Sequence, residues 1–88
     1  MNFRGNIIQG GQVLLTGVSG EIRALGTAGG NPRWEGKFEV PVGAGIGPGP
    51  YRVLTDDGKT ADIEVINLVD QRAGRTRVAY FRCSAEPQ

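Results

Sequence analysis

The segment from Pro50 to Leu68 has the most regular alternation of apolar and polar residues in the chain. Two alternating runs flank the sequence Asp56-Asp57-Gly58-Lys59. Glycine accepts the positive φ that a type I turn followed by a left-handed residue requires, because it has no Cβ to clash with the backbone. The pattern therefore predicts a β-hairpin whose turn lies at residues 56–59.

The alternation also predicts which residues of this hairpin pair. Tyr51 should face Ile63 on the core side, and Arg52 should face Asp62 on the solvent side as a cross-strand ion pair. A shift of one residue would turn Asp62 toward the core, so the register should be firm. The sequence Val65-Ile66 breaks the alternation and predicts either a bulge or a strand that is covered on both faces.

The rest of the chain has no sustained apolar period of 3.6 residues, so no helix is expected. Strands are predicted at residues 1–8, 12–18, 21–25, 33–42, 51–55, 60–68 and 76–84, with a break at Ser19-Gly20. The expected fold class is all-β, a small and mostly antiparallel β-barrel or compact sandwich of about six short strands. The barrel is favoured because closure removes unpaired strand edges.

The segment from Arg33 to Val42 alternates as a half-buried strand does. Trp34, Phe38 and Val40 share one face, while the charged residues share the other. The following sequence GAGIGPGP, residues 43–50, holds four glycines and two prolines and predicts a flexible loop.

Composition places the chain among small globular domains. Its 88 residues predict one domain over residues 1–88, with residues 85–88 as a frayed tail. Cys83 is the only cysteine, so no intrachain disulfide forms, and a small protein without disulfides is expected in the cytoplasm. The apolar runs are too short to cross a membrane.

The chain contains no histidine, which removes the commonest proton shuttle and metal ligand. Serine and cysteine nucleophile systems that depend on histidine are excluded with it. Asp56 and Asp57 are expected to serve the turn, and the glycine-rich loop lacks the Lys-Ser/Thr ending of a phosphate loop. We therefore expect no enzyme activity, no cofactor and no metal site.

The arginines of the C-terminal half are the candidate contacts. Arg72, Arg75 and Arg77 follow an acidic segment, and Arg33 and Trp34 could extend them into a surface that binds phosphates and stacked bases. Two structural alternatives compete with this hypothesis. The last strand could pair with residues 60–68, so that its arginines neutralise acids there, and Trp34 could belong to the core.

The second half of the chain resembles small bacterial β proteins of unknown function. The resemblance is carried by GPYRVLTDDGKTADIEV and by the terminal RVAYFRCSAEP. Those proteins share a GPYR-x-x-x-DDGR-x-x-DI hairpin and an aromatic last strand with a Gly/Ser-rich close, which Arg82-Cys83-Ser84 replaces here. The resemblance implies a small β fold in a bacterial setting and brings no activity with it.

These observations favour a non-enzymatic binding or interaction module of unknown protein partner. Self-association into a homo-oligomer is expected, because a small sheet protein gains buried surface by pairing. The loops at residues 43–50 and 69–75 are the expected contact points. The alternative is a single-stranded nucleic-acid-binding OB- or SH3-like barrel that uses the arginine cluster, although the net charge of +1 does not favour it.

Overall fold

The computed structural model describes residues 1–28, 31–71 and 74–83. Within these residues all regular structure is β, as the missing helical period predicted. The strands are β1 (Asn2–Gln9), β2 (Gln12–Ala28), β3 (Asn31–Pro41), β4 (Gly49–Thr55), β5 (Thr60–Asp70) and β6 (Thr76–Cys83). The predicted frayed tail at residues 85–88 lies outside the described residues.

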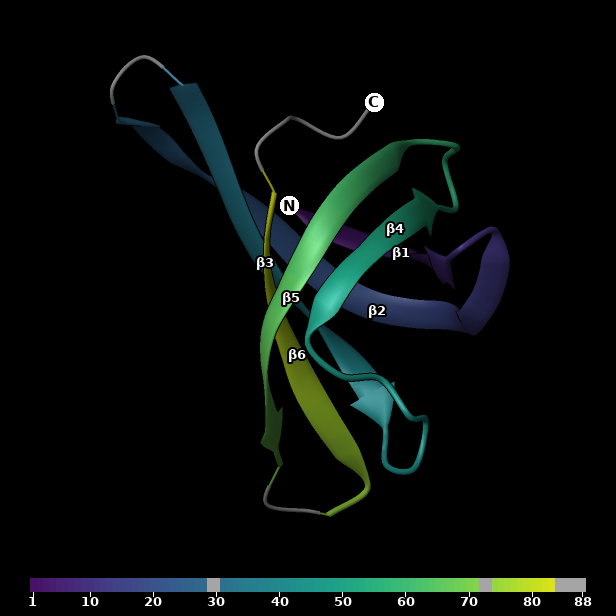
Figure 1. Ribbon diagram of the computed structural model, residues 1–88. Helices are drawn as coiled ribbons and strands as arrows, with labels where there is room; N and C mark the ends of the chain where they lie inside the picture. Colours follow the sequence, from purple (N-terminus) through teal and green to yellow (C-terminus); the bar gives the residue numbers. More distant parts are fainter. Residues whose placement is uncertain (29–30, 72–73, 84–88) are drawn as a thin grey trace.

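The six strands close into an antiparallel barrel in the order β1-β2-β3-β6-β5-β4 (Figure 1). The predicted all-β barrel is therefore confirmed. Strands β1, β2 and β3 form a meander, and β4 returns to pair with β1, which is Greek-key connectivity. Closure leaves no strand of the barrel body with a fully unpaired edge.

The hairpin formed by β4 and β5 has the predicted register. Tyr51 pairs with Ile63 and Arg52 pairs with Asp62. Gly58 has a φ of 88°, as the turn requires. A bulge between Val65 and Asn67 confirms the predicted irregularity in β5.

The expected break at Ser19-Gly20 is wrong, because β2 runs unbroken for 17 residues. Gly20 pairs with Phe3 on one side and with Phe38 on the other, so both of its edges are occupied. A Cβ at Gly20 would overlap the Lys37 carbonyl oxygen and approach the Phe3 ring. Glycine here permits close packing inside a strand instead of ending it.

One end of the barrel is closed by the loop between β3 and β4. Ile46 is only 5% exposed and belongs to the hydrophobic core. The Tyr51 hydroxyl donates to the Gly47 carbonyl oxygen at 2.8 Å and accepts from the Gly47 amide at 3.3 Å. The segment expected to be a flexible loop therefore supplies a plug to the core.

At the other end, β2 and β3 extend beyond the barrel as a two-stranded arm formed by residues 23–28 and 31–34. Met1 exchanges backbone hydrogen bonds with Ile22, and the pairing of β1 with β2 runs from Asn2 opposite Glu21 to Gln9 opposite Gln12. On the other side, the pairing between β3 and β6 extends to Trp34 opposite Cys83 within the described residues. The arm gives the molecule its longest dimension, 39 Å against 27 and 21 Å (Figure 1).

Candidate binding site at the open end of the barrel

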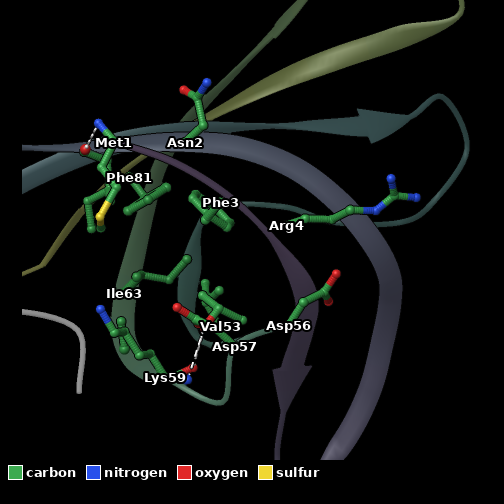
Figure 2. A pocket seen from close by; sticks show the side chains of 13 residues that line it. Met1, Asn2, Phe3, Arg4, Val53, Asp56, Asp57, Lys59, Ile63 and Phe81 are labelled. Atoms are coloured by element: carbon green, nitrogen blue, oxygen red, sulfur yellow. Dashed lines mark hydrogen bonds between the residues drawn. The ribbon is translucent and has the colours of Figure 1, made fainter.

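An apolar pocket of about 210 Å³ opens at the barrel end from which the arm projects. Phe3, Val53, Ile63 and Phe81 form its walls, and they come from four different strands (Figure 2). The Phe3 and Phe81 rings meet edge to face with centroids 6.4 Å apart. These walls are continuous with the hydrophobic core.

The pocket exists because β1 continues past the end of β4. Pairing between these strands starts at Gly5 opposite Thr55, and the chain then turns away toward β5. The Asp56 amide donates to the Arg4 carbonyl oxygen at 2.8 Å and holds the turn against β1. On β5 the small, half-buried Ala61 faces the opening beside Val53 and leaves it unfilled.

Charged residues surround the mouth of the pocket. Asp57 accepts a hydrogen bond from the Thr55 hydroxyl, and this bond lowers the pKa of the Asp57 carboxyl below its ordinary value of 3.8. The Arg4 side chain extends away from the pocket (Figure 2). Within the described residues, no ion pair engages the side chains of Arg4, Asp56 or Lys59.

A second hollow of about 720 Å³ lies at the same end, between the arm and β5. Leu25 and Trp34 of the arm line one side, and Ile66 of β5 lines the other. It shares Ile63 and Phe81 with the smaller pocket. The open end is therefore a broad depression in which apolar residues such as Ile63 and Phe81 lie among charged ones, which are Arg33, Glu35, Asp62, Glu64 and Arg82.

Trp34 is half-buried and packs against the core, as one of the structural alternatives predicted. Its indole Nε1 is buried and has no hydrogen-bond partner among the described residues. Arg33, next to it, is exposed.

The structure separates the sequence-predicted contacts into two groups. Trp34 pairs with Cys83, whereas Arg77 pairs with Val40. Trp34 and Val40 are six positions apart on β3, which is about 20 Å at the usual rise of a strand. Arg33 and Trp34 therefore lie at the open end, and Arg75 and Arg77 lie at the closed end. The remaining candidate, Arg72, lies outside the described residues.

Several basic side chains of the barrel wall already have acidic partners. Arg77 Nε lies 2.9 Å from Asp70 Oδ1, and Arg52 Nε lies 2.8 Å from Asp62 Oδ1. Arg82 stands between Glu35 and Glu64 of the neighbouring strands. The pairing reduces the cationic surface available to a phosphate backbone. Arg75 is exposed and has no ion pair within the described part of the chain.

Sequence reasoning missed the walls of the pocket. Alternation marks Phe3, Ile63 and Phe81 as inward-facing residues, but it does not tell which inward residues meet at an unfilled end. The signal that could have found the site is Ala61, a small residue on the inward face of a strand otherwise lined by large ones.

Among residues 1–28, 31–71 and 74–83, no group of three or more acidic or cysteine side chains is placed to hold a metal ion. The same residues form no helix of the length and apolar character needed to cross a membrane. Comparisons with family models, with curated proteins and with solved structures found no match to this chain.

Proposed function

We propose that this protein is a non-enzymatic binding module that takes an apolar side chain of a protein partner into the pocket at the open end of the barrel. The observation that carries the proposal is the contrast between the two ends. Ile46 plugs one end, while Phe3, Ile63 and Phe81 line an unfilled hollow at the other. Barrel mouths are common binding sites, and solvent-accessible apolar hollows mark them.

The size of the pocket favours a side chain over a free metabolite. Its 210 Å³ is smaller than the roughly 300–1,000 Å³ of pockets that enclose drug-sized ligands. A single leucine, methionine or phenylalanine anchor, by contrast, is the usual occupant of a small apolar hollow in a protein interface. The charged side chains at the mouth, Asp56 and Lys59 among them, would then contact the residues that flank the anchor.

The arrangement of the arginines supports nucleic-acid binding less well. A single-stranded ligand needs a continuous basic track with stacking side chains. Here Arg33 and Trp34 are separated from Arg75 by the length of β3, and Arg77 is already paired with Asp70. We propose a bacterial cytoplasmic setting, which is consistent with a single buried cysteine and with the hairpin resemblance.

The test is a selection of short random peptides displayed on phage against the wild-type protein. We expect the enriched peptides to share one large apolar residue, and we expect their binding to shift the amide NMR signals of residues around Phe3 and Ile63. Ala61→Leu fills the pocket from its wall and should weaken these peptides about tenfold or more.

Thr16→Leu is the control, because Thr16 is exposed on β2 and does not line the pocket. Its amide spectrum and peptide affinity should match those of the wild type. Peptides that bind Ala61→Leu as tightly as the wild type, or whose signals map to another face, would show that the pocket is not the binding site.

A further inference from the structure

The arm carries a large apolar side chain that its own barrel does not bury. Leu25 is 52% exposed and lies at a bulge of β2, where the pairing shifts between Ala24 and Gly26. A bulge turns a side chain out of the regular alternation of its strand. Leu25 thus lies on the arm, partly exposed beside the second hollow and at the same end of the barrel as the unfilled pocket.

Charged residues of both signs lie near each feature, and one exposed cation beside Leu25 and one exposed anion at the pocket concern the contact between them. Arg33 is exposed on the arm, opposite the bulge that holds Leu25, and it has no ion pair within the described residues. Asp56, at the mouth of the pocket, is likewise exposed and has no ion pair there. A surface that pairs Leu25 with the pocket could also pair Arg33 with Asp56.

We infer that the partner of the pocket is a second copy of this chain, bound with the open ends of two barrels facing each other. This inference rests on the proposed function, because it names the occupant of the same pocket. Each protomer inserts Leu25 into the partner's pocket and places Arg33 against the acidic turn that holds Asp56. Leu25 and the pocket lie at the same end of the barrel. A dimer with a twofold axis therefore forms each of the two contacts, Leu25 with the pocket and Arg33 with Asp56, twice.

A dimer of this kind explains why Leu25 stays exposed and the pocket stays unfilled in a single copy. Burial of Leu25 removes apolar surface from water, and the hole that receives it is already shaped by Phe3 and Phe81. The charged pair between Arg33 and Asp56 then fixes the orientation more than it adds affinity.

The first experiment measures the oligomeric state by sedimentation equilibrium from about 1 µM to about 500 µM, a range that spans weak and moderate affinities. We expect a monomer–dimer equilibrium in the wild type. Leu25→Ser should raise the dimer dissociation constant about tenfold or more, because it removes the central apolar anchor. Leu14→Ser is the matched control, since Leu14 is exposed on β2 near the closed end.

The second experiment reverses charges. Arg33→Asp alone and Asp56→Arg alone should each weaken self-association, because like charges then meet at both contacts. An equimolar mixture of the two variants should restore the dimer as a heterodimer, in which both contacts again pair opposite charges. Both positions are exposed, so amide NMR spectra of each variant should show an intact fold.

A wild type that stays monomeric over the whole range would overturn the inference. A dimer that persists unchanged in Leu25→Ser, or a mixture that associates no better than its components, would also overturn it. None of these three results affects the proposed function, which the peptide selection and Ala61→Leu decide separately. The peptide selection could fail while the dimer depends on Leu25 and on the charges at positions 33 and 56. That combination would show that the pocket serves self-association alone.

Discussion

Phe81 lies against Gly36, its partner across β3 and β6, so closely that a Cβ on Gly36 would overlap the ring. The same Cβ would also overlap the carbonyl oxygen of Glu21 on β2. Gly36 therefore lets a strand and an aromatic ring approach each other at one point of the barrel. Because Phe81 lines both hollows of the open end, this approach also shapes the candidate site.

We predict that Gly36→Ala destabilises the protein by about 2 kcal/mol or more, since the backbone oxygen that it meets cannot move aside as a flexible side chain would. The free energy of unfolding in urea measures the effect. Gly47→Ala is the control, because no atom lies within 4 Å of a Cβ there and its φ is not positive. Equal stability of the two variants would contradict the packing seen at Gly36.

We predict that Tyr51→Phe lowers the free energy of unfolding by about 1 kcal/mol, the usual net contribution of a hydrogen bond that is lost. The hydroxyl joins β4 to Gly47 and so holds the loop that carries Ile46. Hydrogen exchange of the Gly47 amide should accelerate as well.

Tyr80→Phe provides the comparison for that variant. Tyr80 is 43% exposed, and its hydroxyl makes no hydrogen bond within the described residues. We expect its stability to stay within about 0.5 kcal/mol of the wild type. A larger loss in Tyr80→Phe than in Tyr51→Phe would show that the loop is not held through Tyr51.

We predict that Thr55→Val raises the pKa of Asp57 back toward 3.8, because the Thr55 hydroxyl is the largest cause of its depression. A ¹³C NMR titration of the Asp57 carboxyl measures it. The folded-state pKa lies below the unfolded one, so this bond stabilises the fold above about pH 4 and is lost as pH falls through the folded-state pKa. An unchanged titration in Thr55→Val would refute the assignment.

Local chemistry explains why the hairpin could be predicted in detail. Gly58 supplies the turn, and the alternation on both sides leaves one register that keeps Asp62 in solvent and Ile63 in the core. The bulge at Ile66 followed from a break in the same alternation. Each of these features depends on residues within one hairpin.

The candidate site could not be predicted in the same way, because its parts are far apart in the chain. Phe3 and Phe81 meet only after β1 and β6 take their places in the closed barrel. The predicted arginine contacts fail for the same long-range reason. The sequence groups Arg33 with Arg77 by residue type, but antiparallel pairing of β3 with β6 places them at opposite ends of the barrel.

The sequence by itself determined the all-β class, the β4–β5 register and the absence of histidine chemistry, because these depend on residue type and on short-range alternation. Only the tertiary structure decided which barrel end is plugged by Ile46 and which stays open beside Phe3. That difference comes from where each strand ends relative to its neighbours, a long-range property that no local pattern encodes.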